Sequence, residues 1–293
     1  MTSTERTGHE SYYGRPILKQ PVWKSEVGWY LFTGGLAGAS ASLSLAARMA
    51  GNRSLARTSS LVAAAAVNVS PLLLVKDLGR PERFLNMLRV FKPTSPMSVG
   101  SWLLAATGTA QSAATTCELL DVLPRVGGGA QACAGLLGPA LATYTGALLS
   151  DTAVPAWHEA RRELPAVFAA SSCASAGAAA TLVGDVRATG PARRLAVLGA
   201  AAELVATGIM ERRLGVLGEP YRQGRAGRYA RVAKPATAAG LAVTALGRGR
   251  LRRAGAALIL GGAVLQRFAI FEAGKASARD PRYTLALQRQ HAG

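Results

Sequence analysis

Residues 75–102 read VKDLGRPERFLNMLRVFKPTSPMSVGSW, and in this stretch an apolar run ends in a tight charged turn before a second apolar run begins. Gly79 suits the left-handed position that follows a helix end, and Pro81 cannot continue that helix. The pattern is typical of a membrane edge. We therefore expect Asp77 and Arg80 to lie at the lipid–water boundary within pairing reach of each other.

The composition favours a membrane protein built largely from small residues. Of 293 residues, 49% are hydrophobic, 17% are charged and 6% are aromatic, and the formal net charge is +18. In a soluble protein this charge would indicate nucleic acid, but here the Lys and Arg residues flank apolar runs instead of interleaving with aromatic residues. We therefore expect the basic residues to anchor the chain in a lipid bilayer, and we expect no nucleic-acid partner.

Uncharged runs predict the membrane-spanning helices. Five runs have eighteen or more residues, which suffices to cross a bilayer; they are residues 27–47, 58–75, 98–117, 130–150 and 164–184. The fourth run follows a loop that we expect at Gly127–Gly129. Three weaker candidates are 195–210, which contains Glu203, and 235–247 and 254–266, extended to Lys234 and Arg267, whose long stems can reach the interface. The sequence thus predicts an all-α integral membrane protein with about eight transmembrane helices.

Polar segments flank the apolar part of the chain. We expect a polar N-terminal arm over 1–26, a transmembrane domain over 27–271 and a polar C-terminal tail over 272–293. The arm does not resemble a cleavable signal, because no apolar core follows an early basic segment and no small-residue cleavage site comes after it.

The basic residues leave the orientation in the membrane open. The side that would hold both termini carries 22 Lys and Arg residues, and the opposite short loops carry 11. The positive-inside rule would make the first side cytoplasmic. Its segments are also much longer, so the density of positive charge does not favour that side.

Ligands for a redox metal are scarce in the sequence. The three histidines, His9, His158 and His291, all lie outside the middle of the predicted spans, so we expect no haem and no zinc or copper site. Three cysteines fall inside apolar runs without Cys-x-x-Cys spacing. This arrangement indicates neither a disulfide framework nor an iron–sulfur cluster in this chain.

Two ionisable residues are candidates for a proton path. Glu203 is the acidic residue clearly within a span, where it indicates either an ion or proton route or a structural pairing with Arg193, Arg194 or a polar group on another helix. His158 is the second candidate, because histidine is the side chain whose unperturbed pKa lies nearest neutrality, but solvated loop histidines are more common than proton carriers. Its neighbour Trp157 is explained by the aromatic belt at the membrane interface.

Four stretches together carry a resemblance to a known family; they are residues 29–40 (WYLFTGGLAGAS), 76–84 (KDLGRPERF), 92–102 (KPTSPMSVGSW) and 144–157 (YTGALLSDTAVPAW). They resemble the NrfD/PsrC family, the integral membrane subunits of polysulfide reductase, nitrite reductase and related molybdopterin enzymes. The Asp-Leu-Gly-Arg-Pro turn is the most specific part. The resemblance runs from about residue 12 to at least residue 215.

The resemblance implies a multi-pass subunit of two four-helix bundles in the cell (cytoplasmic) membrane. Such a subunit docks to a four-cluster ferredoxin-like iron–sulfur protein, which in turn contacts a molybdopterin catalytic subunit. Members of the family exchange electrons with a quinone or quinol, here menaquinone or ubiquinone. The family's quinone pocket uses polar residues at the start of the first helix and a tyrosine on the fourth, which correspond here to Glu26, Trp29, Tyr30 and Tyr144.

Other residues of the matching stretches have structural or docking interpretations. We expect Asp77, Arg80 and Pro81 to brace the charged turn or to contact a partner subunit, and not to bind the quinone, since buried charged pairs persist only when satisfied. We expect Trp157 to have the same structural or docking role.

The leading hypothesis is therefore a membrane anchor and quinone-reactive subunit that is not an enzyme alone. An alternative is a proton-coupled secondary transporter that uses Glu203, although the two halves of the chain lack the internal repeat with broken helices that a transporter favours. A third possibility is a purely structural anchor that keeps the charged turn but binds no quinone.

Overall fold

The computed structural model describes residues 18–19, 21–80 and 82–285, without the side chains of residues 83–85. Within this part of the chain the regular structure is entirely helical, which confirms the all-α prediction. The helices of 20 residues or more are α1 (Ser25–Met49), α2 (Arg53–Leu78), α4 (Pro96–Leu120), α5 (Pro124–Ser150), α7 (Leu164–Val183), α8 (Gly190–Arg213), α10 (Gly224–Leu246) and α11 (Arg250–Arg279). Each of them overlaps one of the predicted spans.

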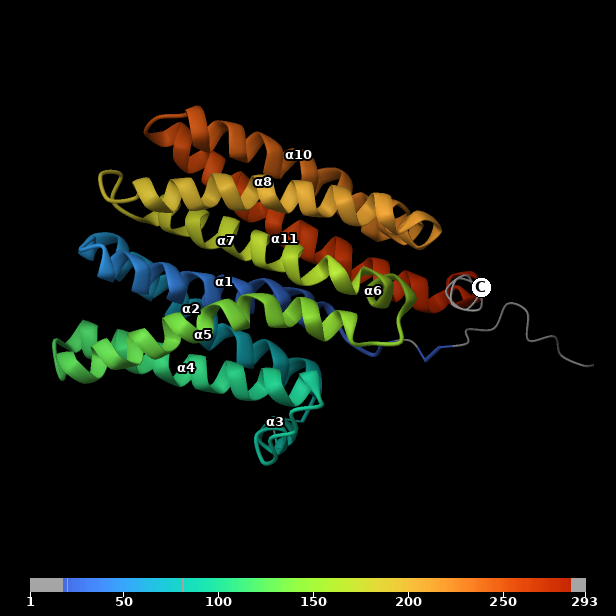
Figure 1. Ribbon diagram of the computed structural model, residues 1–293, viewed down its shortest axis with the longest axis horizontal. Helices are drawn as coiled ribbons and strands as arrows, with labels where there is room; N and C mark the ends of the chain where they lie inside the picture. The colour runs from blue at the N-terminus through green and yellow to red at the C-terminus, as the bar shows by residue number, and fades with distance from the viewer. Residues whose placement is uncertain (1–17, 20, 81, 286–293) are drawn as a thin grey trace, which may run out of the picture.

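The long helices form two groups that lie side by side (Figure 1). Helices α1, α2, α4 and α5 pack together and are called the N-terminal bundle; α7, α8, α10 and α11 pack together and are called the C-terminal bundle. The two bundles meet where α1 and α5 contact α7 and where α1 contacts α11.

The two ends of the bundles differ in their connections. At the short-loop end, residues 50–52, 121–123, 184–189 and 247–249 join successive long helices. At the long-loop end, on the right in Figure 1, the connections contain the short helices α3 (Glu82–Met87), α6 (Pro155–Glu159) and α9 (Glu219–Arg222), with 3₁₀ turns at Ala160–Arg162 and Gly215–Gly218. Helix α2 ends as predicted, with Gly79 in the left-handed conformation at φ 69°.

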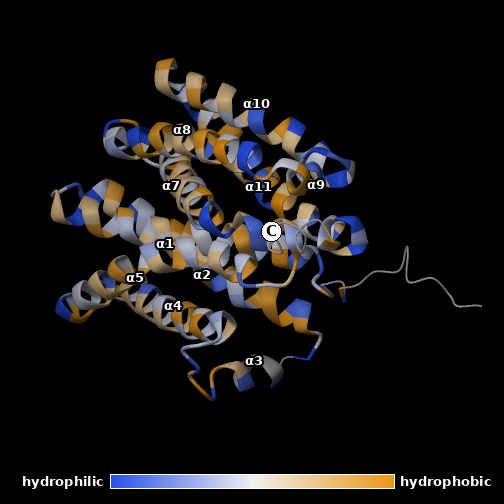
Figure 2. Cartoon of the chain, turned by 45° about the vertical axis from the view of Figure 1, so that its right-hand side comes forward, coloured by the Kyte–Doolittle hydropathy of each residue, from blue (hydrophilic) through white to orange (hydrophobic). Residues whose placement is uncertain are grey.

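Hydrophobic residues occupy much of the long helices, and hydrophilic residues gather toward the helix ends and connections (Figure 2). Four of these helices, α2, α5, α7 and α11, are long and apolar enough to cross a membrane by length and composition. Helix α11 is among them although its uncharged run has only thirteen residues, because the helix itself extends over 30 residues.

Small residues allow close packing where the sequence predicted it. A Cβ atom at Gly38 of α1 would lie 3.0 Å from the backbone nitrogen of Ala142 and closer still to the carbonyl oxygen of Gly138 on α5. Ser42 of α1 donates a hydrogen bond to the Gly135 carbonyl at 2.8 Å. Backbone atoms of the two helices are therefore almost in contact, as small residues permit in lipid.

The loop predicted at Gly127–Gly129 is wrong, because these residues are the first turns of α5, which begins at Pro124. A Cβ atom at Gly127 would lie 2.8 Å from Cβ of Cys117 on α4. The glycine lets two antiparallel helices approach closely near their connection. Tertiary packing has thus overridden the low helix propensity of glycine.

Candidate functional site

A cavity of about 80 Å³ lies at the long-loop end of the N-terminal bundle, between α1, α2, α4 and α5. We call it the tyrosine cavity. Its lining is mostly apolar and comprises Trp23, Val27, Tyr30, Leu74, Asp77, Leu78, Met87, Met97, Ser101, Tyr144 and Leu148. Few polar groups therefore converge on an apolar space, as in small-molecule sites.

Two tyrosines from different helices meet at this cavity. Tyr30 of α1 is buried, and its side chain interacts with that of Tyr144 on α5. The ring of Tyr144 lies against Gly100 of α4, where a Cβ atom would overlap the phenol. Gly100 thus provides the space that the Tyr144 ring occupies. The structure brings together the two tyrosines that the resemblance implied.

Asp77 lies on the wall of the tyrosine cavity and fixes the start of α1. Its Oδ1 atom accepts a hydrogen bond from the backbone N–H of Lys24 at 2.9 Å. Beside it, Lys76 forms an ion pair with Glu26 at 3.1 Å. The C-terminal end of α2 therefore holds the N-terminal end of α1 through two polar contacts.

The expected pairing of Asp77 with Arg80 is not formed in the described part of the chain. Helix α2 ends at Leu78, and the turn at Gly79 leaves Arg80 exposed to solvent. Asp77 braces the start of α1 instead. Pro81, which we grouped with these residues, lies outside the described residues.

Glu26 and Trp29 do not line the tyrosine cavity. Glu26 is turned toward Lys76, and Trp29, 45% exposed, packs edge-on against Phe268 of α11 with ring centroids 5.5 Å apart. Of the four residues that the resemblance implied for a quinone pocket, Tyr30 and Tyr144 therefore face the cavity.

An aromatic row joins the tyrosine cavity to the C-terminal bundle. Trp23 of the cavity wall stacks on Trp157 of α6 at 5.7 Å, and Trp157 stacks on Phe271 of α11 at 6.3 Å. The Trp157 indole donates a hydrogen bond to the Ile270 carbonyl at 2.8 Å, and Trp157 is 0% exposed. Lys275 also donates to the Trp23 carbonyl at 3.2 Å. Trp157 is therefore a core residue here and presents no surface to a partner.

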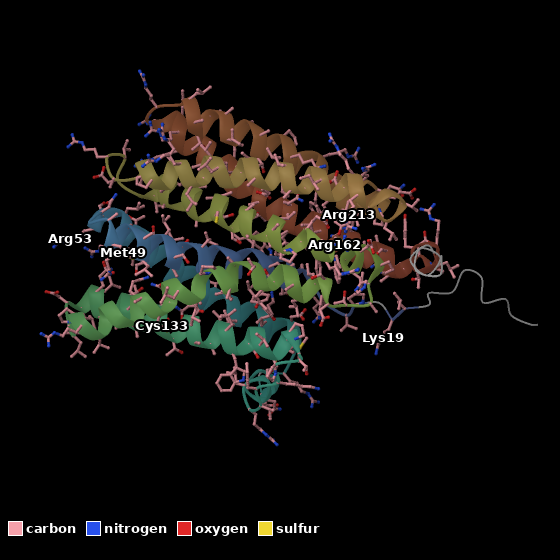
Figure 3. The ribbon with its side chains drawn as sticks, viewed as in Figure 1. Lys19, Met49, Arg53, Cys133, Arg162 and Arg213 are labelled. Carbon is pink, nitrogen blue, oxygen red and sulfur yellow. The ribbon has the colours of Figure 1, made fainter. Side chains whose placement is uncertain are left out.

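Polar contacts hold α6 in place at the long-loop end. The Tyr221 hydroxyl donates to the Ala156 carbonyl at 3.0 Å, and burial raises the pKa of Tyr221 well above its ordinary value, so the phenol keeps its proton. Arg213 forms ion pairs with Glu159, at 2.8 Å, and with Glu163. Figure 3 shows Arg213 near Arg162 at this end of the molecule. His158 is half-buried on α6 and is not part of the cavity lining.

Glu203 lies in the other bundle, and the charge that it interacts with is Arg267 of α11. Both residues are 2% exposed. The Arg267 guanidinium donates to the Phe168 carbonyl at 3.0 Å and to the Ser172 hydroxyl at 3.1 Å, and it lies 3.7 Å above the Phe168 ring. The expectation that Arg267 reaches the interface is therefore wrong. Its side chain points into the bundle, where it bonds the Phe168 carbonyl and the Ser172 hydroxyl.

No ion pair or hydrogen bond joins Glu203 to Arg267 in the described residues, so the two groups interact through their charges alone. Within them, neither oxygen of Glu203 has a hydrogen-bond partner, and neither do Nε and Nη1 of Arg267. Arg193 and Arg194, proposed as partners from the sequence, lie near the other end of α8. The structure therefore supplies a partner from another helix, one that sequence reasoning had assigned to the interface.

Sequence reasoning missed several polar residues. Ser101 of the cavity lies within the stretch 92–102 that carries the resemblance, and Trp23 lies just before the first predicted span. Gln111 and Gln131 are buried in the N-terminal bundle, where the Gln111 amide donates to Ser60 Oγ at 3.0 Å. The signal that could have identified Gln111 and Gln131 is an uncharged amide within a predicted span.

The part of the chain that the structure describes contains no group of three or more His, Cys, Asp or Glu side chains able to hold a metal ion.

No curated protein matches the chain. A family model described as polysulphide reductase, NrfD, matches residues 17–206, nearly two thirds of the chain, and this range includes the whole tyrosine cavity. The chain therefore belongs to the NrfD family of polysulphide reductase membrane subunits.

Proposed function

We propose that this chain is the membrane-anchor and quinone-reactive subunit of a molybdopterin and iron–sulfur oxidoreductase complex, and that the tyrosine cavity is its quinone site. The observation that supports the proposal is the meeting of Tyr30 and Tyr144 at an apolar cavity that opens at one end of the bundle. A quinone site needs an apolar slot for the ring and one or two hydrogen-bonding groups for the carbonyl oxygens.

The residues of the cavity fit such a ligand. The two phenols are donors that suit carbonyl oxygens, and side chains such as Val27, Leu74 and Leu148 keep water away from the ring. A volume of about 80 Å³ is well below the ~300–1,000 Å³ of ordinary small-molecule pockets, so the cavity suits a ring and the isoprenoid tail stays outside it, between the helices.

The proposed chemistry divides between the ligand and the chain. Menaquinone or ubiquinone, when bound, takes up or releases two electrons together with two protons. Tyr30 and Tyr144 orient the ring by hydrogen bonding. Asp77, on the cavity wall near the long-loop end, holds the start of α1 against the cavity by accepting the Lys24 backbone N–H. His158 on α6 and Glu203 with Arg267 are the candidates for proton transfer.

Family membership supports a proposal for the partners. We propose that a four-cluster ferredoxin-like iron–sulfur subunit docks at the long-loop end, which the tyrosine cavity adjoins, and that this subunit contacts a molybdopterin catalytic subunit. All eight long helices then cross the cell membrane. This arrangement places the quinone ring close to the partner that exchanges its electrons.

The continuous helices favour this function over transport. Transporters of the kind weighed above bind their substrate where helices are broken near the middle of the membrane. In the described residues each long helix runs without such a break. Glu203 alone does not distinguish the two functions.

The test is the quinone and iron content of the tagged chain, purified from detergent-solubilised membranes together with whatever subunits accompany it. We expect quinone and an iron–sulfur protein to copurify. Tyr144→Phe and Tyr30→Phe should each weaken quinone retention roughly five-fold, the effect of one lost hydrogen bond of about 1 kcal/mol.

A matched tyrosine outside the cavity serves as the control. Tyr229→Phe removes a phenol that lines a different part of the surface and should leave quinone retention unchanged. A wild-type chain that purifies with neither quinone nor iron would contradict the proposal, and so would equal losses in all three variants.

A further inference from the structure

A second cavity, of about 630 Å³, lies on the C-terminal bundle beside the first turns of α10. We call it the arginine groove; it is lined by Arg225, Arg228, Tyr229, Val232 and Leu265. None of these residues lines the tyrosine cavity, and all of them lie beyond residue 206, outside the region that the family model matches.

The mouth of the arginine groove has an excess of positive charge. Arg225 and Arg228 are exposed and lie three residues apart, so they share one face of α10. Arg225 lies 3.9 Å from Glu272 of α11, at the outer limit of an ion pair. No carboxylate in the described part of the chain is within ion-pair distance of Arg228. Two guanidinium groups therefore face one carboxylate.

Deeper along the helices the groove becomes aromatic and then aliphatic. Tyr229 packs against Phe268 with ring centroids 5.8 Å apart, and Phe268 in turn packs against Trp29 of α1 at 5.5 Å. Val232 follows Arg228 by one helical turn, about 6 Å further along α10, and is exposed although apolar. Leu265 of α11 forms the opposite wall.

This order of chemistry matches one occupant. From the long-loop end inward, the groove offers cations, then a tyrosine of the kind found at headgroup level, then aliphatic side chains. A phospholipid presents a phosphate, a glycerol backbone and acyl chains in the same order. A docked protein subunit would contact the arginines but would not cover the exposed aliphatic side chains, which lie at membrane depth.

We propose that the arginine groove is a binding site for an anionic phospholipid. The lipid phosphate lies between Arg225 and Arg228, and an acyl chain follows Val232 and Leu265. Trp29, which packs on Phe268 behind Tyr229, then lies near the lipid. The site needs only that the C-terminal bundle sits in a bilayer, so it stands whether or not the tyrosine cavity holds a quinone.

Tryptophan fluorescence provides the test. The purified chain, with any subunits that accompany it, is reconstituted in phosphatidylcholine vesicles. These contain either bromine-labelled phosphatidylglycerol or bromine-labelled phosphatidylcholine, since bromine quenches tryptophan at short range. We expect phosphatidylglycerol to quench more strongly. Trp29→Phe should remove the difference between the two lipids, because Trp29 is the tryptophan linked to the groove through Phe268, which packs on Tyr229.

Charge variants with a matched control then identify the site. Arg225→Gln with Arg228→Gln should lower the preference for phosphatidylglycerol by roughly five-fold for each arginine, the factor for ~1 kcal/mol per basic residue near an anionic lipid. Arg248→Gln with Arg250→Gln removes the same charge from exposed positions at the short-loop end and should leave the Trp29 signal unchanged.

Three outcomes would overturn the proposal. The first is equal quenching by the two lipids in the wild-type chain, and the second is a preference that survives in the Arg225→Gln, Arg228→Gln variant. The third is loss of a partner subunit in that variant with an unchanged lipid preference, which would assign the arginines to protein docking instead.

Discussion

Glu203 and Arg267 are opposite charges that lie in the middle of the C-terminal bundle, on helices α8 and α11. Their partners are unequal, because Arg267 also bonds the Phe168 carbonyl and the Ser172 hydroxyl, whereas no hydrogen bond to the Glu203 carboxylate is formed within the described residues. Without the arginine, the buried carboxylate has neither a hydrogen bond nor a nearby positive charge within the described residues. Without the carboxylate, the arginine still has its two hydrogen bonds.

Arg267→Met should consequently destabilise the chain by about 1–3 kcal/mol, the usual cost of leaving buried polar groups without a hydrogen-bond partner. Glu203→Gln should cost less, and the double variant should be more stable than the sum of the two single losses predicts. Thermal unfolding in detergent measures all three. Arg250→Met, at an exposed position of the same helix, is the control and should change stability by less than about 0.5 kcal/mol. Strictly additive losses would contradict a coupling between the two charges.

At the residue scale, the sequence identified the unusual group but not its partner. Glu203 was conspicuous because it is an acid within an apolar run. Arg267 looked like an end residue, because its uncharged run is short and arginine stems commonly reach the interface. Which way its side chain points depends on the helix that packs against it, and that contact joins segments distant in the chain.

At the scale of helices, the contact of α1 with α5 depends on glycines at a few positions. Gly38 faces the backbone of Gly138 and Ala142, and backbone cannot move aside as a side chain can. Gly34, one turn earlier, has side-chain atoms of Tyr30 and Thr145 as its nearest neighbours, at 3.6 and 3.9 Å, which is ordinary contact.

Gly38→Ala should therefore force the two helices apart and destabilise the chain by about 1–3 kcal/mol, the usual range for overpacking. Gly34→Ala should be neutral or stabilising by up to ~1 kcal/mol, because alanine is the better helix former. Thermal unfolding of the two variants side by side distinguishes close backbone packing from a general need for glycine in α1. Equal losses would indicate the latter.

The positions of the long helices could be predicted, because a helix that crosses lipid needs a run of apolar residues. Each of the long helices overlaps such a run. Helix ends were less predictable. Helix α5 begins before its glycine triplet, and α11 continues past its uncharged run to Arg279. In both cases contacts with neighbouring helices, and not composition, decide where the helix ends.

At the scale of the whole molecule, the tyrosine cavity could be predicted only in part. The family resemblance drew attention to Tyr30 and Tyr144, and these two do meet. Trp23 and the brace from Asp77 to Lys24 were not foreseen, because they depend on how the polar segment before α1 folds back onto α2 and α6. Such contacts leave no periodic signal in the sequence.

The arrangement of connections predicts the topology of the whole chain. If all eight long helices cross the membrane, every connection at the long-loop end faces one side and every connection at the short-loop end faces the other. Val22 and Val216 are exposed at the first end, and Met49 and Leu246 are exposed at the second. Leu136 is exposed near the middle of α5 and should face lipid.

Single cysteines at these positions, in a chain whose three native cysteines are replaced by alanine, can be labelled in intact cells with a membrane-impermeant maleimide. We expect one pair to react from outside and the other pair only after the cells are opened, while Leu136→Cys reacts in neither case. Helix α10 is the sharpest case, because Val216 lies in the connection that precedes it, Leu246 is its last residue, and it is not among the four helices apolar enough to cross a membrane by length and composition. Labelling of both from the same side would mean that α10 does not cross, and the arginine groove would then lie outside the bilayer.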